Sequence, residues 1–324
     1  MKTSSPKTCA FTGKLVTVAA LGLLLAGCGT KQPPLRVGIN SWPGYEFLWL
    51  AHEKGFFRDA GVEVKLVQFG SLSDARRAFE SGNLDGWATT VVEVLMSRDA
   101  SPRDARIVRV IDASEGADVI IAPKSIQSPR DLRGIRVGVE LASLGVYMLG
   151  RALELEGLTL QDVTPVSSVQ ELMGEQMRSG ALDAAVSYPP QSAALLADAR
   201  FHAIFSSQRI PGEVVDVLAF DSETLRLRSQ QVAAFQQALD RAFRFYQEQP
   251  MEAARIMGLR EGLSAEDFQT QLTEGIRLIT PAEQASFLRG AASLRPVVEG
   301  VARHLNSTGL LSARPGLTDC LPAP

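Results

Sequence analysis

The sequence is short of the residues that build metal centres and disulfide frameworks. Its 324 residues include three cysteines and three histidines. His52, His202 and His304 stand alone, without a metal-ligand spacing such as H-E-x-x-H. The sequence also lacks a G-x-S-x-G elbow and a phosphate-binding P-loop. We therefore expect no metal, no cofactor, no catalytic residue and no structural disulfide, and we do not expect an enzyme.

Long apolar runs are missing after residue 28, where no segment is long enough to cross a bilayer. Before that point the chain carries three lysines and no acid, followed by an apolar run of secretory-signal length over 15–26. The run ends in L-A-G-C, and this order resembles a bacterial lipoprotein signal, in which Cys28 is cleaved free and acylated. We expect a signal peptide over 1–27, lipidation of Cys28 and a tether over 28–34. The alternative is an ordinary secretory signal with a chance cysteine.

Basic charge is scarce in the rest of the chain. Removal of residues 1–27 would leave 30 Lys and Arg against 36 Asp and Glu, a net charge of −6. An acidic balance argues against nucleic acid and anionic lipid surfaces as partners. The composition is otherwise that of a globular protein, 45% hydrophobic and 21% charged, with enough length for two lobes that each have a core.

Short apolar segments alternate with amphipathic segments along most of the chain. Strand patterns occur at 36–39, 62–69, 84–88, 107–111, 119–122, 135–139, 163–166, 182–186, 201–205 and 214–220. Helical patterns fill most of the intervals, form a long segment at 229–249 and continue as helices from 251 to 306. This alternation predicts an α/β fold with mostly parallel sheets covered by helices. Residues 307–324 are expected to form a loose tail.

Two segments about a hundred residues apart are alike. They are S-G-N-L-D-G-W-A-T-T at 81–90 and S-G-A-L-D-A-A-V-S-Y at 179–188. Each combines a helix end, a glycine, a short strand and a polar residue at the strand tip, which indicates one structural unit used once in each of two lobes. Asp85 and Asp183 are expected to brace turns there rather than to touch a ligand.

With these segments placed, the chain resembles the nitrate/sulfonate/taurine-type solute-binding proteins of ABC importers, which are related to thiamine-pyrimidine receptors. The resemblance covers about 35–250 and rests on the two segments above, on W-P-G-Y-E-F-L-W-L-A-H-E-K-G-F-F-R-D-A-G-V-E-V (42–64) and on S-P-R-D-L-R-G-I-R-V-G-V (128–139). It implies a type II periplasmic-binding fold with ligand in a cleft between two α/β lobes. The implied lobes are 35–118 with 218–324, and 119–217, joined by crossing strands at 117–121 and 215–219.

Polar residues at strand tips are the candidate ligand contacts, because open α/β sheets bind ligands where strands lead into helices. The loop at 40–46, N-S-W-P-G-Y-E, offers two aromatic rings and one acid. The expected ligand-binding residues are Asn40, Trp42, Gly44, Tyr45, Glu46, Thr89, Thr90, Ser114, Glu140, Ser143, Tyr188 and Asp216. Helix capping is the alternative for Thr89, Thr90 and Ser143. Trp49 and Trp87 fit a core position as well as a cleft position.

The strand-tip segments contain seven acids and no Lys or Arg. The acids are Glu46, Glu93, Asp112, Glu115, Asp118, Glu140 and Asp216. A buried anion needs compensating charge or donors, so this imbalance favours a cationic, zwitterionic or neutral solute, with Glu46 and Glu140 facing it. Two points favour an oxyanion instead: helix amino termini hold anions without basic side chains, and the family resembled includes nitrate and sulfonate receptors.

The resemblance implies an extracytoplasmic lipoprotein that captures a small polar organic solute and delivers it to an ABC permease and ATPase complex. It would act as a monomer, anchored on the periplasmic or cell-surface face of a bacterial membrane. One alternative is a sensing receptor of the same fold that reports to a membrane signalling protein. Another is an enzyme of thiamine-pyrimidine synthase type, but the C-C-C-x-C segment expected for that enzyme is absent.

Overall fold

The computed structural model describes residues 1–8, 32–312 and 314–322. It divides into two units, Met1–Pro33 and Pro34–Pro324, and the described helices and strands belong to the second. The signal-peptide and lipid-anchor predictions fall largely outside the described residues, Cys28 included, and stay predictions. Within the described ranges, no helix combines the length and apolar character that crossing a membrane requires.

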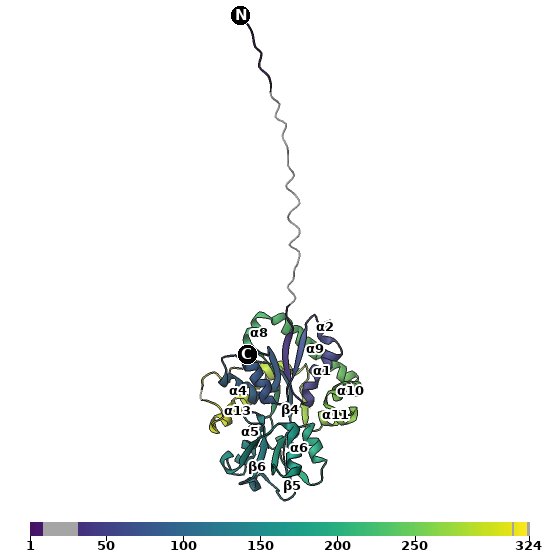
Figure 1. Ribbon diagram of the computed structural model, residues 1–324, viewed down its shortest axis with the longest axis vertical. Coiled ribbons are helices and arrows are strands. Elements are labelled where there is room, and N and C mark those ends of the chain that lie inside the picture. The colour runs from purple at the N-terminus through teal and green to yellow at the C-terminus, as the bar shows by residue number, and fades with distance from the viewer. Residues whose placement is uncertain (9–31, 313, 323–324) are drawn as a thin grey trace. The chain divides into compact units, whose positions relative to one another are not determined.

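A six-stranded sheet forms the core of one half of the second unit, which we call lobe one (Figure 1). Its strands are, in spatial order, β11 (Ile276–Leu278), β4 (Ala105–Ser114), β10 (Val215–Asp221), β3 (Gly86–Thr90), β1 (Leu35–Ile39) and β2 (Val64–Gln68). β1 pairs parallel with β2 and β3, whereas β10 pairs antiparallel with β3 and β4, and β11 antiparallel with β4. β3 is buried throughout, which accounts for a sequence without polar alternation.

A five-stranded sheet forms the core of the other half, lobe two, drawn in teal tones in Figure 1. Its strands are, in spatial order, β7 (Thr164–Ser167), β6 (Arg136–Val139), β8 (Ala184–Ser187), β5 (Val119–Pro123) and β9 (Phe201–Ser206). β6 pairs parallel with β7 and β8, and β5 pairs antiparallel with β8 and β9. The prediction of mostly parallel sheets is therefore wrong. β5 and β10 are the first strands after the chain changes from one sheet to the other, and both are antiparallel to their neighbours.

The chain passes from lobe one to lobe two between β4 and β5 and returns between β9 and β10. The two crossing segments are residues 115–118 and 207–214. They are joined to each other, because Ser207 Oγ lies 2.8 Å from Ser114 Oγ and accepts a hydrogen bond from Gly116 N at 2.7 Å. The crossings predicted at 117–121 and 215–219 are thus a few residues late, since the strand pattern there belongs to the receiving sheet.

The two repeated segments form the same unit in both sheets. In lobe one, Arg36 donates from its backbone N to Asp85 Oδ2 at 2.8 Å and from Nη2 to Oδ1 at 2.7 Å. In lobe two, Arg136 makes the same two bonds to Asp183 at 3.2 and 2.9 Å. Both acids brace loops before a strand, as the sequence predicts. The repeat therefore places the tips of β1 and β3 in one lobe, and of β6 and β8 in the other, in equivalent positions.

Helices cover both sheets. Those of lobe one are α1 (Glu46–Glu53), α2 (Phe56–Asp59), α3 (Leu72–Glu80), α4 (Val91–Ala100), α8 (Ser222–Leu227), α9 (Ser229–Glu248), α10 (Pro250–Glu261), α11 (Ala265–Thr273), α12 (Gln284–Arg289) and α13 (Arg295–Ser307). Those of lobe two are α5 (Leu144–Glu154), α6 (Gln170–Ser179) and α7 (Gln191–Leu196). The long α9 matches its prediction and stacks Phe235 on Phe57 of α2, with ring centroids 4.9 Å apart.

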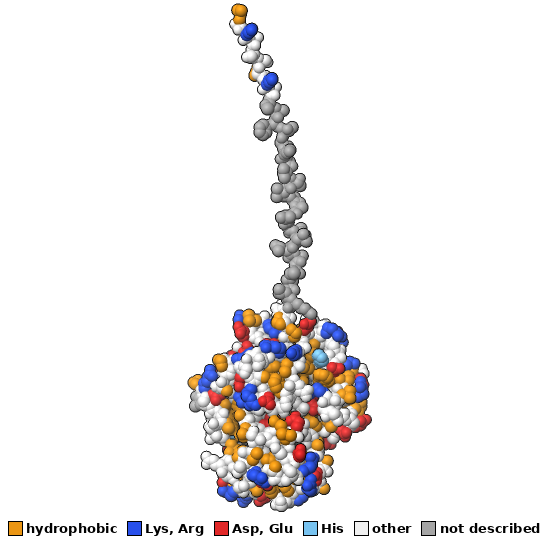
Figure 2. All heavy atoms as spheres, viewed as in Figure 1, with side chains coloured by type: hydrophobic (Ala, Val, Ile, Leu, Met, Phe, Trp, Pro, Cys, Tyr) orange, Lys and Arg blue, Asp and Glu red, His pale blue; other side chains and the backbone are white. Residues whose placement is uncertain are grey.

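The surface of the second unit mixes charges of both signs. On the face shown in Figure 2, acidic and basic side chains are interspersed without a broad area of either sign. Pairs such as Arg255 with Glu252, 2.8 Å apart, illustrate this arrangement on one helix. Exposed pairs of this kind contribute little stability but keep the surface well solvated.

The carboxyl-terminal part differs from the sequence expectation in two places. β11 interrupts the range predicted to be helical and forms the edge of the six-stranded sheet beside β4. The tail predicted to be loose is tied to the same strand, because Ile107 N donates to Cys320 O at 2.8 Å. Cys320 is a buried free thiol, and burial raises its pKa to about 11, which makes it unreactive. Both features depend on β4, which lies far away in the sequence.

Candidate functional site

Loops at the tips of both sheets enclose a small cavity between the lobes. Nine residues line it: Asn40, Trp42, Tyr45, Leu72, Thr90 and Asp216 from lobe one, Leu144 and Tyr188 from lobe two, and Asp118 from the first crossing segment. None is more than 7% exposed. The cavity measures about 10 Å³, close to the least space that one water molecule needs. The lobes are therefore closed on each other, and side chains fill the space between them.

Trp42 fixes the loop after β1 against the floor of the cavity. Its indole Nε1 donates to the carboxylate of Asp112 on β4, at 3.1 and 3.3 Å from the two oxygens. Gly44 permits this approach, since a Cβ there would stand 1.8 Å from Asp112 Oδ2. The indole ring meets Tyr188 of lobe two edge-on, with centroids 5.9 Å apart. Gly44, which the sequence suggested as a ligand contact, therefore serves the close packing of its own loop.

Two carboxyl groups meet directly beneath this loop. Asp112 and Asp216 are register partners on β4 and β10, and each carboxyl group bears on the pKa of the other. Two buried carboxyl groups that interact in this way disfavour simultaneous ionisation. Burial raises the pKa of Asp112 to about 7, and burial with the charge of Asp112 raises the pKa of Asp216 well above its ordinary value. Tyr45 donates its hydroxyl to Asp216 from the other side.

Glu140 and Tyr188 form the wall that lobe two contributes. The Tyr188 hydroxyl donates to Glu140 Oε1 at 3.2 Å and accepts from Nδ2 of Asn40 in lobe one at 3.4 Å. The backbone N–H of Leu72, at the start of α3 in lobe one, acts to lower the pKa of Glu140. Burial, together with the charge of Glu93, raises the pKa of Glu140 to about 8. The Tyr188 hydroxyl thus links Glu140 of lobe two to Asn40 of lobe one.

Glu93 makes a direct connection from lobe one to lobe two. It lies in the first turn of α4 and accepts hydrogen bonds from Ser143 Oγ at 3.0 Å and from Leu144 N at 2.7 Å, at the amino terminus of α5. Its second oxygen accepts from the hydroxyl of Thr90. A helix amino terminus presents open N–H groups and partial positive charge, and so it attracts anions. The anion position of α5 is filled here by a carboxylate of the same chain.

Three buried acceptor oxygens at or beside the cavity have no hydrogen-bond partner within the described residues. They are Asn40 Oδ1, Asp118 Oδ2 and Glu140 Oε2. Burial raises the pKa of Asp118 to about 7. A buried acceptor without a donor costs free energy, so three of them around one cavity indicate a place where donors are to be supplied.

Glu46, one of the acids predicted to face the solute, does not reach the cavity. Its fully buried carboxylate accepts hydrogen bonds from Nε of Arg260 on α10, at 2.7 and 2.9 Å. The expectation for Glu46 is therefore corrected: it is one half of an ion pair inside lobe one. The 214 positions between the two partners hide this pairing from sequence patterns.

The structure separates the other predicted site residues into two sets. Asn40, Trp42, Tyr45, Thr90, Tyr188 and Asp216 line the cavity, with Glu140 and Ser143 directly bonded to its surroundings. Thr90 also caps α4, as the alternative held, by accepting a bond from Val92 N at 3.1 Å. Thr89 lies in β3 and Ser114 binds the crossing segments together, and neither lines the cavity. Trp87 is in the core, and Trp49 stacks on His52 instead.

The sequence-based list omitted four residues that the geometry makes prominent. Leu72 and Leu144 line the cavity from the first turns of α3 and α5, and Asp118 lies in a crossing segment. Glu93 holds the lobes together. The sequence could have indicated Asp118 and Glu93, since both belong to acid-rich strand-tip segments without a basic residue. It could not have indicated the two leucines, because an apolar residue at the start of a helix is usually a core residue.

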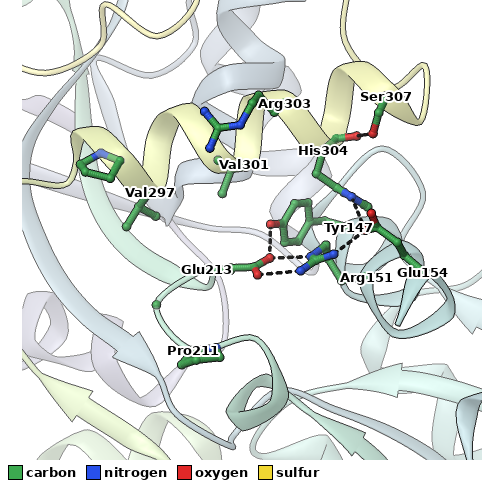
Figure 3. Close-up of a pocket in the computed structure, with 13 residues that line it drawn as sticks. Tyr147, Arg151, Glu154, Pro211, Glu213, Val297, Val301, Arg303, His304 and Ser307 are labelled. Atoms are coloured by element: carbon green, nitrogen blue, oxygen red, sulfur yellow. Dashed lines mark hydrogen bonds and ion pairs between the residues drawn. The ribbon is translucent and has the colours of Figure 1, made fainter. Parts of the chain in front are cut away.

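A wider groove of about 590 Å³ lies where α5, α13 and the 207–214 crossing segment meet (Figure 3). Its acids are paired with neighbouring groups. Glu213 accepts from Tyr147 Oη at 2.6 Å and from Arg151 at 2.7 and 2.9 Å, and His304 Nδ1 lies 3.0 Å from Glu154. The groove therefore connects lobe two, the return crossing and α13 of lobe one, and its carboxylates are not free for a ligand.

Comparison with known proteins places these features in a family context. A profile of the NMT1/THI5-like family matches residues 42–253. The formylaminopyrimidine-binding protein of Halalkalibacterium halodurans is 24% identical over 182 residues, which are 53% of this chain and 55% of that protein. The match thus spans about half the length of this curated relative.

Solved structures with the same architecture cover most of the chain. The alkanesulfonate-binding protein SsuA of Xanthomonas axonopodis pv. citri, bound to MOPS, has a TM-score of 0.74 at 17% identity, covering 87% of this chain and 95% of its own. The nitrate-binding protein NrtA of Synechocystis PCC 6803 has a TM-score of 0.68 at 12% identity, covering 88% and 84%. These likenesses confirm the predicted periplasmic-binding fold.

Proposed function

The chain belongs to the NMT1/THI5-like family, and on that premise we propose that it is the solute-binding component of an ABC importer. It captures a small polar organic solute between its lobes and presents that solute to a permease and ATPase complex. The names of its relatives support this function, since formylaminopyrimidine-, alkanesulfonate- and nitrate-binding proteins all take small solutes.

The observation that carries the proposal is the convergence of polar and aromatic side chains from both lobes on one buried point. The four equivalent strand tips contribute Asn40 after β1, Thr90 at the end of β3, Glu140 after β6 and Tyr188 after β8. An interface needed only for stability would bury apolar groups there, because unpaired buried polar atoms are costly. The residues we assign to the site are Asn40, Trp42, Tyr45, Thr90, Asp118, Glu140, Ser143, Tyr188 and Asp216.

Binding requires the lobes to separate, since a cavity of about 10 Å³ does not admit an organic solute. The polar contacts that cross the cleft include Asn40 with Tyr188, and Glu93 with Ser143 and Leu144. His304 of α13 also lies 3.0 Å from Glu154 of α5. The paired crossing segments 115–118 and 207–214 form the hinge. Opening therefore breaks these contacts, and each sheet keeps its own strand pairing.

We extend the proposal to the amino terminus, where Cys28 becomes the first residue of the mature chain and carries acyl groups. Acyl chains of this kind hold a soluble domain at a bilayer surface. They would keep the binding protein on the extracytoplasmic face of the membrane, close to its permease.

A thermal-shift screen of the purified protein against small solutes tests the function first. A solute that binds only the folded state raises the melting temperature by mass action. Uptake of the solute found is then measured in cells with and without the gene. We expect the deletion to abolish high-affinity uptake. Uptake that is unchanged by the deletion, accompanied by a lost transcriptional response to the solute, would assign the protein to the sensing class instead.

A further inference from the structure

Five acids surround the cavity, and in the described part of the chain no Lys or Arg lines it. The acids are Glu93, Asp112, Asp118, Glu140 and Asp216, each at most 4% exposed. They act on one another, since the charge of Glu93 bears on Asp118 and Glu140, and that of Asp118 on Asp216. Other buried acids of the chain have basic partners, as Glu46 has Arg260 and Asp85 has Arg36. The cluster at the cavity is thus an exception within the same molecule.

The amino terminus of α5, which faces the cleft, already holds a carboxylate from the opposite lobe. Glu93 of lobe one accepts a hydrogen bond there from Leu144 N. This is a position at which an oxyanion could bind without a basic side chain. An anionic solute would have to displace Glu93 and then lie among four further acids.

The unpartnered oxygen atoms of the site need hydrogen-bond donors from a ligand. Asn40 Oδ1 and Asp118 Oδ2 belong to side chains that are 2% exposed and line the cavity, and no donor among the described residues reaches either oxygen. Trp42 and Tyr188 add aromatic rings, which attract cations at their faces. Among the described residues, no group of His, Cys, Asp and Glu is arranged to hold a metal ion. Nitrogen donors of an organic group suit these features.

We propose, on the premise that the protein is a solute receptor, that its solute is a small organic cation bearing an ammonium, an amidinium or a protonated heterocycle. The cation donates N–H hydrogen bonds to the free acceptors and takes the place of a proton in the acid cluster. The O–H bond of one protonated carboxyl breaks, its proton leaves to solvent, and the resulting carboxylate pairs with the cation. Binding therefore exchanges one positive charge for another.

The same exchange accounts for cation-dependent closure. The groups that face the acid cluster are Tyr45 and Tyr188, with Glu171 acting on Glu140, and none of them supplies positive charge. Closing the lobes without a cation confines the acids in a dry space, where each must keep a proton or meet repulsion. A bound cation removes this penalty, so the closed state becomes favourable when the solute is present.

Calorimetry on the mature protein at pH 7 tests the charge directly. The probes are butylamine, butylguanidine and 4-amino-5-hydroxymethyl-2-methylpyrimidine against butanesulfonate and nitrate, so that the butyl series changes only the charged group. Each titration is repeated in phosphate and in Tris, whose ionisation enthalpies differ. We expect a cationic probe to bind and to release protons. Tighter binding of butanesulfonate or nitrate than of the cations would overturn the inference and leave the receptor function standing.

Variants connect the result to the site. Asp118→Asn and Glu93→Gln should each weaken cation binding at least about tenfold, because the partner of a buried charge is lost. Glu252→Gln is the matched control, since Glu252 is exposed and paired with Arg255 outside the site. Cation binding that is unchanged in both site variants would overturn the inference.

If no probe binds, the melting temperatures of the unliganded variants at pH 8 test the inference. If the acids serve to bind a cation, Asp118→Asn and Glu140→Gln relieve repulsion between them and raise the melting temperature above that of the wild type. Lower melting temperatures in both variants would show that the acids stabilise the empty fold, and would overturn the inference. Failure of the receptor function itself is distinguished by the gene-deletion uptake assay.

Discussion

At the scale of single residues, the buried carboxyl groups set how the protein responds to pH. Burial raises the pKa values of Asp112 and Asp118 to about 7 and that of Glu140 to about 8. The folded chain therefore keeps protons that the unfolded chain releases near pH 4. The stability that these groups contribute is complete below the unfolded pKa and is lost as the pH rises through the folded values.

We expect the unliganded protein to lose stability between pH 6.5 and pH 8.5. Acids with lowered pKa values, such as Asp74 and Asp198, are already ionised throughout this window. Burial lowers the pKa of His304, so that group is mostly neutral there as well. Melting temperatures across the window measure the effect, and Asp118→Asn should flatten the curve while Glu252→Gln leaves it unchanged. A wild-type curve that is level or rises would contradict the assignment.

Trp42 is the single side chain whose loss should affect binding most clearly. It lines the cavity and contacts both Asp112 and Tyr188. We expect Trp42→Ala to weaken solute binding by more than about 1 kcal/mol, because a large aromatic contact is removed from the centre of the site. Trp49→Ala is the control, since Trp49 stacks on His52 away from the cavity. An unchanged dissociation constant for Trp42→Ala would return the residue to a packing role.

At the scale of secondary-structure elements, the repeated strand unit offers a matched pair of ion pairs. The Asp85 side chain is 9% exposed and also accepts from Arg228, whereas the Asp183 side chain is 35% exposed. We expect Asp85→Asn to lower the free energy of unfolding by about 1–3 kcal/mol, the cost of unsatisfied buried donors. Asp183→Asn should cost less than about 1 kcal/mol, as exposed pairs do. Urea unfolding measures both, and equal losses would contradict the difference in burial.

The elements that sequence patterns predicted correctly are those with local causes. The strand–helix alternation, the repeated unit and the amphipathic α9 follow from periodicity, turn residues and short-range pairing. The mixed strand directions, β11 and the bound tail depend on where distant segments meet at β4. The Glu46–Arg260 pair and the Glu93 bonds to α5 also join segments that are distant in the sequence. The sequence therefore predicted that the site is rich in acids, but it could not predict which groups these acids contact.

At the scale of the whole molecule, hydrogen bonds and buried charge act on closure in opposite directions. Glu93 reaches from lobe one to the amino terminus of α5 in lobe two, where a carboxylate is favourable. The other buried acids of the cluster oppose closure while no cation is bound. The balance between the two sets the equilibrium between open and closed forms.

Membrane attachment is a property of the whole chain that one substitution tests. We expect Cys28→Ser to release the protein from the membrane fraction, because the thiol that carries the acyl group is lost. Cys320→Ser is the control, since that cysteine is buried in lobe one. Cell fractionation followed by immunoblotting measures the distribution. Unchanged membrane association of Cys28→Ser would sink the lipoprotein assignment.

Small-angle X-ray scattering of the mature protein, with and without a saturating solute, tests the central claim that the lobes open and close around a ligand. We expect the unliganded protein to show a larger radius of gyration than the closed structure, because the acid cluster disfavours closure. Addition of the bound solute should reduce the radius of gyration toward the closed value. Identical scattering curves under conditions in which calorimetry demonstrates saturation would contradict it.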